Sequence, residues 1–152
     1  MLAKIISGGQ SGGDRGGLRG AVRCGIPTGG TAPRGWRTDE GPRPDLAFLG
    51  LVEHASADYL PRTAANVMDA DGTLFVGRES PGEAATRRYA REAHLPYLRV
   101  SFPGGDVNVG AIAAWLERHK IRVLNVAGNR ERTNPGIEQF TLDLIYAVQR
   151  HA

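Results

Sequence analysis

Short apolar runs alternate with longer segments of helical periodicity along almost the whole chain. Strands are expected at residues 3–7, 28–32, 73–76, 97–101 and 122–126, and an apolar run at 46–52 suggests an extra strand. Four helices are expected to begin at residue 14, at 58 or 59, at 81 and near 109. A last helix is expected over residues 137–148, where apolar residues recur at i, i+3, i+4, i+7 and i+8. Strands that alternate with helices pair in parallel through right-handed crossovers. The pattern predicts an α/β three-layer sandwich with a parallel sheet of order 2-1-3-4-5, counting the strand at 73–76 as the third.

Nothing in the sequence divides it, so residues 1–152 are expected to form a single ligand-binding domain. The glycine- and proline-rich stretch 29–44 is interpreted as an ordered functional loop inside that domain. No run approaches the ~20 apolar residues of a membrane span, and the start of the chain does not resemble a signal peptide. The lone Cys24 fits a reducing compartment. A cytoplasmic protein without a membrane partner is therefore expected.

The charge pattern favours a small anionic ligand over a nucleic acid. The net charge is only +3, and the basic residues are spread rather than gathered into a stripe with aromatic residues. Several arginines flank glycine or proline loops instead, namely Arg15, Arg34, Arg37 and Arg130. A guanidinium grips phosphate with two parallel hydrogen bonds. The four histidines are scattered without metal-ligand spacing, so no metal site is predicted.

The loop that follows the first strand is the strongest candidate for ligand binding. Ligands of parallel sheets bind beyond the carboxyl ends of the strands, and this loop holds the candidate residues Gly8, Gly9, Gln10, Ser11, Gly12, Asp14 and Arg15. Glycines let backbone N–H groups approach an anion, and the next helix adds its positive dipole. The loop is neither a P-loop nor the dinucleotide fingerprint. We expect the Gly12 amide to face a phosphate, so that Gly12→Asp weakens binding while stability changes little, because the loop is taken to be exposed.

Two further loops follow later strands at the same expected edge of the sheet. The segment 80–86 offers Gly82 and Thr86, although an ordinary Pro-Gly turn before a helix explains it equally well. The segment 125–131 offers Asn125, Gly128 and Arg130, and is more polar than a short connection requires.

Two more clusters are candidates. Arg62 and Asn66 lie one helical turn apart, which predicts a polar helix face that either binds ligand or is simply solvated. Arg34 and Gly35, in the segment 33–37, are candidates for a lid over a ring or a phosphate. No catalytic set of Ser, His and Asp or of Cys and His can be assembled, so no catalytic residue is assigned.

The ordered set of motifs resembles the molybdenum carrier protein family. The opening Ser7-Gly8-Gly9-Gln10-Ser11-Gly12-Gly13-Asp14-Arg15 is similar to the family signature Ser-Gly-Gly-Gln-Thr-Gly-x-Asp-Arg. Further matches follow in order at 25–27, 29–30, 33–35, 59–63, 66–67, 69–73, 123–128, 130–131 and 135–137. The resemblance covers nearly the whole chain.

The resemblance implies a Rossmann-like domain that binds the molybdenum cofactor, a pterin with a terminal phosphate, without turnover. It also links the chain to the "Lonely Guy" nucleotide phosphoribohydrolases and the DNA-processing protein A domain. Those enzymes carry Pro-Gly-Gly-x-Gly-Thr beside a catalytic glutamate and arginine. Here the segment 81–86 lacks the second and third glycines.

Two hypotheses follow for the function. The first is a carrier or sensor for molybdenum cofactor, or for a phosphorylated nucleotide-like ligand. In it the Gly8–Gly12 amides and Arg15 bind phosphate, and Arg34, Arg62, Asn66 and Asn125 frame the rest. The alternative is a phosphoribohydrolase-like enzyme that cleaves an N-glycosidic bond with Glu83 polarising water.

A homo-oligomer is also expected. Tyr89, Trp115 and Tyr146 are taken to lie outside the core stripes of their helices, where a second copy of the chain can cover them.

Overall fold

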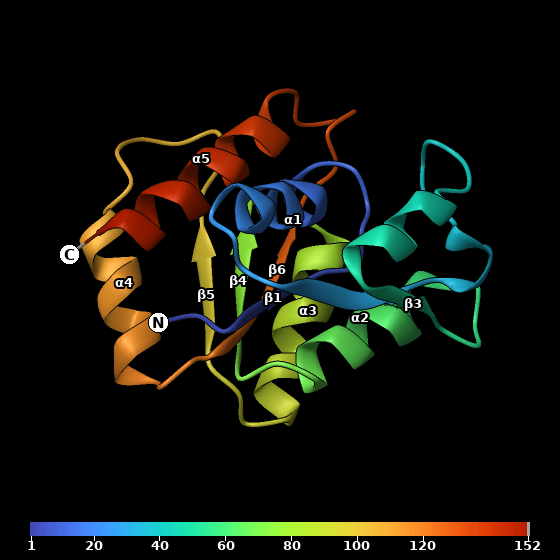
Figure 1. The fold of residues 1–152 in the computed structure, drawn as a ribbon, viewed down its shortest axis with the longest axis horizontal. Helices are drawn as coiled ribbons and strands as arrows, with labels where there is room; N and C mark the ends of the chain where they lie inside the picture. Colours follow the sequence, from blue (N-terminus) through green and yellow to red (C-terminus); the bar gives the residue numbers. More distant parts are fainter. Residues whose placement is uncertain (152) are drawn as a thin grey trace.

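The structure is a computed structural model that describes residues 1–151. Its centre is a six-stranded sheet in which every pair of neighbouring strands is parallel (Figure 1). The strands are β1 (Lys4–Ile6), β2 (Thr28–Ala32), β3 (Leu51–Glu53), β4 (Gly72–Val76), β5 (Tyr97–Val100) and β6 (Val123–Gly128). The run predicted at 46–52 divides into a 3-10 helix (Pro44–Leu49) and the short edge strand β3.

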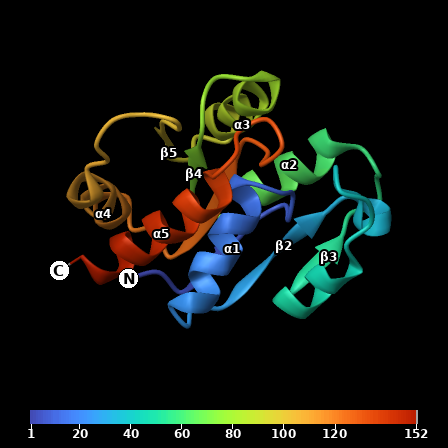
Figure 2. The same cartoon turned by 90° about the horizontal axis from the view of Figure 1, so that it is seen from above.

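Within residues 1–151, five α-helices cover the two faces of this sheet, as the three-layer prediction requires. They are α1 (Gly13–Arg23), α2 (Tyr59–Met68), α3 (Pro81–Glu92), α4 (Val109–Arg118) and α5 (Ile137–Arg150). The helices α1, α4 and α5 lie on one face and α2 and α3 on the other (Figure 2). The Rossmann-like α/β class is confirmed.

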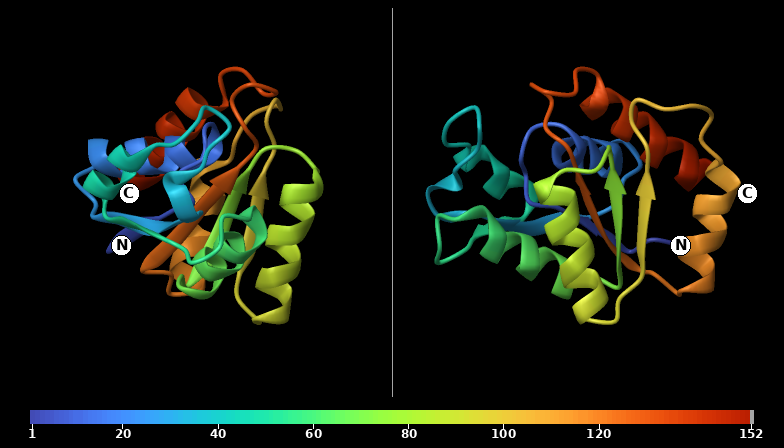
Figure 3. Two further views of the ribbon diagram at one scale, coloured as in Figure 1. Left: turned by 90° about the vertical axis from the view of Figure 1, so that its right-hand side faces the viewer. Right: turned by 180° about the vertical axis from the view of Figure 1, so that it is seen from behind.

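The strand order differs from the predicted 2-1-3-4-5. The observed order is β3-β2-β1-β6-β4-β5, so the last strand of the chain lies in the middle of the sheet (Figure 3). β6 pairs with β1 at Ile5↔Leu124 and with β4 at Thr73↔Asn125. At the start of β6 the Asp71 carboxylate accepts the N–H groups of Arg122 and Val123 at 3.0 and 2.8 Å, which fixes this strand beside β4. Burial patterning identifies a buried strand but does not say which neighbours it takes.

The helix α1 packs unusually close to its neighbours because one of its faces is made of glycine. A Cβ at Gly16 would lie 2.5 Å from the carbonyl oxygen of Glu138, and one at Gly17 would lie 2.6 Å from Val126. At Gly20 the added Cβ would meet Ile145 at 2.8 Å. Protein interiors leave no room for such overlaps. The glycines of α1 therefore serve its contact with α5 and β6.

The larger hydrophobic core lies between the sheet and α4 and α5, and it contains Trp115. Trp115 is only 8% exposed, so the prediction that it lies outside the core is wrong. Within residues 1–151, none of the helices combines the length and the apolar character needed to cross a membrane.

Candidate functional site

A cavity of about 620 Å³ opens at the carboxyl ends of β1, β6 and β4. Its walls come from the first loop, the starts of α2 and α3 and the segment after β6. Ten of the residues predicted from the sequence line it: Gly8, Gln10, Asp14, Arg62, Asn66, Gly82, Thr86, Asn125, Gly128 and Arg130. The structure thus brings together the three loops that the sequence singled out.

Six predicted residues do not line the cavity, and Gly12 is the most informative of them. Gly12 precedes α1 with a φ of 87°. A Cβ there would overlap the carbonyl oxygen of Asn129 and lie 2.8 Å from the N atom of Glu131. The amide of the next residue, Gly13, donates to that Asn129 oxygen at 3.0 Å. The backbone after β6 thus covers the start of α1, and the prediction that Gly12 is exposed is wrong.

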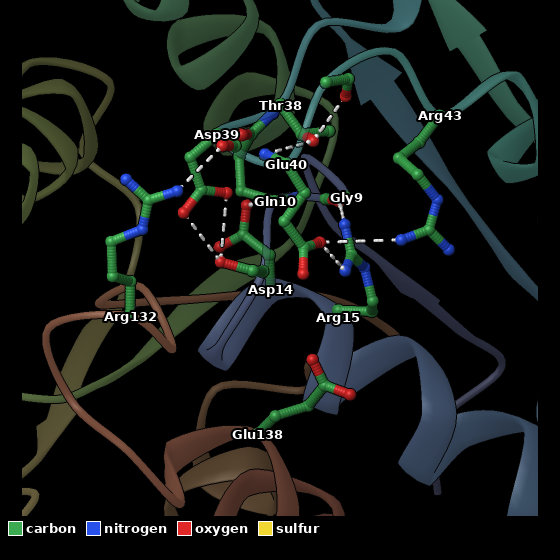
Figure 4. Close-up of polar contacts among 12 residues, drawn as sticks. Gly9, Gln10, Asp14, Arg15, Thr38, Asp39, Glu40, Arg43, Arg132 and Glu138 are labelled. Atoms are coloured by element: carbon green, nitrogen blue, oxygen red, sulfur yellow. Dashed lines mark hydrogen bonds and ion pairs between the residues drawn. The ribbon is translucent and has the colours of Figure 1, made fainter.

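Arg15 does not line the cavity, and its guanidinium points toward Gly9 and Glu40 (Figure 4). It donates to the carbonyl oxygen of Gly9 at 3.1 Å and forms an ion pair with Glu40. Ser11 donates its hydroxyl to the Asp39 carboxylate at 3.1 Å. Ser11 and Arg15 therefore fasten the first loop to Asp39 and Glu40, and Arg15 also holds the Gly9 carbonyl of its own loop.

The two predicted lid residues of the segment 33–37, Arg34 and Gly35, do not line the cavity. Arg34 and Gly35 are exposed, and the Gly35 N–H donates to the Glu53 carboxylate at 2.7 Å. Arg37 instead lies against the cavity wall, since its guanidinium stands 4.5 Å from the centre of the Tyr59 ring. The ring in turn lines the cavity.

Asp14 is a buried carboxylate that organises one wall. It accepts the N–H groups of Gly128 at 3.2 Å and Gln10 at 3.4 Å, and it pairs with Arg62 at 3.4 Å. Burial raises the pKa of the Asp14 carboxyl, against the opposing effect of the Arg62 charge. A Cβ at Gly8 would overlap the Arg62 guanidinium. Gly8 therefore provides the space in which Arg62 pairs with Asp14.

Cationic side chains gather around Tyr59. The guanidiniums of Arg130 and Arg62 lie 4.5 and 5.5 Å from the centre of its ring. Burial and the neighbouring Arg130 charge both lower the pKa of Arg62. Two like charges so close to one another favour an anion between or beside them.

Arg78 is a third cavity arginine, and the sequence analysis missed it. Two of its guanidinium nitrogens donate to Asn134 Oδ1 at 3.0 and 2.9 Å, which fixes the side chain. Its backbone N–H donates to Asn129 Oδ1 at 2.6 Å, and the Asn129 amide donates to Ser80 at 3.1 Å. Arg78 follows β4 by two residues, so the rule that ligands lie beyond strand ends could have identified it.

The start of α3 is not covered by other parts of the protein, whereas the start of α1 is covered by the backbone after β6. Ser80 caps the helix by accepting the Glu83 N–H at 3.1 Å. A Cβ at Gly82 would meet only Ser80 Oγ, at 3.9 Å, and Gly82 lines the cavity. This helix start is therefore accessible to an anion.

Three buried polar atoms of cavity residues lack a hydrogen-bond partner within residues 1–151. They are Gln10 Oε1, Asn125 Oδ1 and Arg62 Nε. Gln10 and Asn125 are 3% and 2% exposed. Native proteins leave few such atoms unpaired.

The side-chain amide of Asn66, by contrast, has partners for both its oxygen and its nitrogen. It exchanges two 2.9 Å hydrogen bonds with the Thr31 backbone, so it joins α2 to β2.

Glu83 does not reach the cavity, which bears on the hydrolase hypothesis. Its carboxylate accepts the Tyr97 hydroxyl at 2.6 Å and pairs with Arg87 at 3.1 Å. Burial beside this carboxylate raises the pKa of Tyr97.

In the described part of the chain, no group of three or more His, Cys, Asp or Glu side chains is placed to hold a metal ion.

The comparisons with known proteins place the chain in a family and match its fold. The model of the circularly permutated YpsA SLOG family matches residues 5–149. The chain belongs to this family. Within the solved structures, the "putative molybdenum carrier protein" of Syntrophus aciditrophicus SB is similar to this SLOG protein, with a TM-score of 0.88 and 36% sequence identity over 97% of this chain and 94% of that one. None of the curated proteins compared matches the chain. The family resemblance drawn from the motifs is confirmed.

Proposed function

We propose that the cavity binds a small phosphorylated ligand, a pterin or a nucleotide-like molecule, and that the protein carries this ligand without turnover. One observation carries the proposal: Arg62, Arg78 and Arg130 line a single cavity beside buried polar atoms that lack partners. Ligand pockets of this size take molecules of drug-like dimensions.

The phosphate is assigned to the start of α3 and to Arg78 and Arg130. The open helix start supplies partial positive charge, and guanidiniums pair with phosphate oxygens. The unpartnered oxygens of Gln10 and Asn125 are acceptors, so they suit N–H groups on the ring system of a pterin or a purine.

The residues present fit the organic part of the molybdenum cofactor. Arg78 and Arg130 would hold its phosphate, and Gln10 and Asn125 would meet its pterin. When bound, the group supplies a dithiolene that holds molybdenum. The cavity lining contains neither Cys nor His, so the metal would receive no such ligand from this chain. This agrees with the molybdenum carriage named for the Syntrophus aciditrophicus protein.

Carriage is favoured over N-glycosidic hydrolysis because Glu83 is bound to Tyr97 and Arg87 outside the cavity. A glutamate in that position cannot polarise water at a ligand held by Arg78 and Arg130. The cytoplasmic location and the homo-oligomer stay predictions.

The test compares two arginine variants by calorimetric titration with molybdopterin and with GMP. We expect Arg130→Gln to weaken binding at least about tenfold, because it removes a charge-assisted contact. Arg34→Gln is the matched control, since Arg34 is exposed and lies outside the cavity. Equal affinities for the two variants, or no binding of either probe to the unchanged protein, would contradict the proposal.

A further inference from the structure

A second hollow adjoins the cavity on the outer side of α2 and α3. It measures about 460 Å³ and is lined by Leu60, Pro81, Ala84, Ala85, Arg87, Arg88 and Arg91. Leu60 and Ala85 line both hollows, so the two spaces share a wall. Leu60 is 50% exposed, so this wall is apolar and reachable from outside.

Two arginines of this groove have little local compensation for their charge. Arg87 is paired with the buried Glu83 carboxylate at 3.1 Å. Arg88 has its nearest carboxylate, that of Glu92, only at 3.9 Å. Arg91 forms no ion pair with the residues that the structure describes. The Arg88 guanidinium also lies 5.2 Å from the centre of the Tyr89 ring. The groove therefore combines an apolar strip with two exposed guanidiniums.

This combination suits a nucleoside that continues from a phosphate at the start of α3. Counted at 1.5 Å per residue, Arg88 and Arg91 follow Gly82 by about 9 and about 14 Å along the helix. Aliphatic side chains pack against a ribose or a base, and guanidiniums stack on aromatic rings as well as pairing with phosphate. Pro81, the first residue of α3, lines the groove, and Leu60 and Ala85 line both hollows. A molecule held at this helix start would therefore extend past Leu60 and Ala85 into the groove.

We propose that the ligand is a dinucleotide. One half lies in the cavity, the diphosphate lies at the start of α3, and the second nucleoside lies in the groove against Leu60, Arg88 and Arg91. This inference rests on the proposed function, because it extends the ligand assigned to the same cavity.

The experiment titrates the protein with two matched pairs of probes: GMP with P1,P2-diguanosine diphosphate, and molybdopterin with its guanine dinucleotide. We expect a dinucleotide to bind about tenfold more tightly than its mononucleotide partner, through the added stacking and charge contacts. The double variant Arg88→Gln/Arg91→Gln is expected to remove this preference and leave mononucleotide affinity unchanged. Glutamine keeps the helix propensity of arginine, and a thermal melt checks folding.

The control is Arg118→Gln/Arg122→Gln, which removes the same charge at exposed positions outside the groove. It should keep the preference for dinucleotides. Equal affinities within both pairs, or an equal loss for mono- and dinucleotides in the groove variant, would overturn the inference. A groove variant that keeps the preference would assign the groove to another occupant, such as an acidic protein segment, and would also overturn it.

The two proposals fail in different ways. If mononucleotides bind and depend on Arg130 but dinucleotides bind no better, only the dinucleotide is wrong. If none of the four probes binds, the proposed function is wrong as well.

Discussion

The first loop (residues 7–15) and the turn before α3 (residues 80–86) lie at the same edge of the sheet, and both precede a helix. Their glycines meet different surroundings. A Cβ at Gly12 would overlap the backbone of the segment after β6, whereas a Cβ at Gly82 would meet no atom closer than 3.9 Å. At the start of α1 the Gly13 N–H is bound to the Asn129 carbonyl, while Gly82 at the start of α3 lines the cavity.

The difference shows that glycine content alone does not locate an anion site. Glycine permits close approach, but the approaching group can be the protein's own backbone as well as a ligand. The first loop, which holds more glycines, packs against the protein's own backbone. The turn before α3, which holds fewer glycines, is accessible from the cavity. Substitutions at matched positions of the two turns test this distinction.

The largest expected effect is on stability, at Gly12. Gly12→Ala adds a side chain at a φ of 87° and forces it against the Asn129–Glu131 backbone. We expect a loss of at least about 3 kcal/mol in the free energy of unfolding, from overpacking and left-handed strain. Urea denaturation measures it. A folded variant of unchanged stability would show that the start of α1 is open after all.

The second effect is on affinity, at Gly82. Gly82→Glu places a carboxylate where the phosphate is assigned, and should weaken binding of GMP or molybdopterin about a hundredfold. Stability should not fall, since acidic residues suit the first turn of a helix. Gly82→Gln is the neutral control of similar size and should lose less affinity. If the Gly82→Glu protein binds with undiminished affinity, the phosphate does not lie at the start of α3 and the assignment is wrong.

The smallest effect concerns Arg15, the predicted phosphate ligand that the structure places elsewhere. Arg15→Gln loses the contacts to Gly9 and Glu40, and about 1 kcal/mol of stability is expected to go with them. Ligand affinity should stay the same. Arg19→Gln, on the exposed side of the same helix, should change stability still less. A tenfold loss of ligand affinity in Arg15→Gln would show that the phosphate binds at the first loop, as the sequence analysis expected.

Much of the fold follows from the sequence because periodicity and strand–helix alternation report burial directly. The α/β class, the parallel pairing and the helices at 81–92 and 137–150 agree with the expectation to within a few residues. The position of β6 between β1 and β4 could not be read in this way. It depends on long-range contacts, such as Asp71 with Arg122 and the glycine face of α1 against α5.

The residues that line the cavity were predicted in outline, but Gly12 and Arg15, on which the sequence analysis placed the phosphate, do not line it. Strand ends located Asn125, Arg130 and Gly82. The sequence analysis passed over Arg78, although the same rule points to it two residues after β4. Composition could not show that Gly12 and Arg15 contact other parts of the protein, because a loop that packs on another loop has the composition of one that binds a phosphate. Only the observed contacts with Asn129 and Glu40 distinguish the two.

The most direct test of the central claim is a crystal structure of the protein with tungstate, a tetrahedral oxyanion like phosphate whose position anomalous scattering identifies. The account predicts the anion in the cavity, against the start of α3 and the guanidiniums of Arg78 and Arg130. Tungstate bound to the amides of residues 8–13 beside Arg15, with the cavity free of it, would contradict the account.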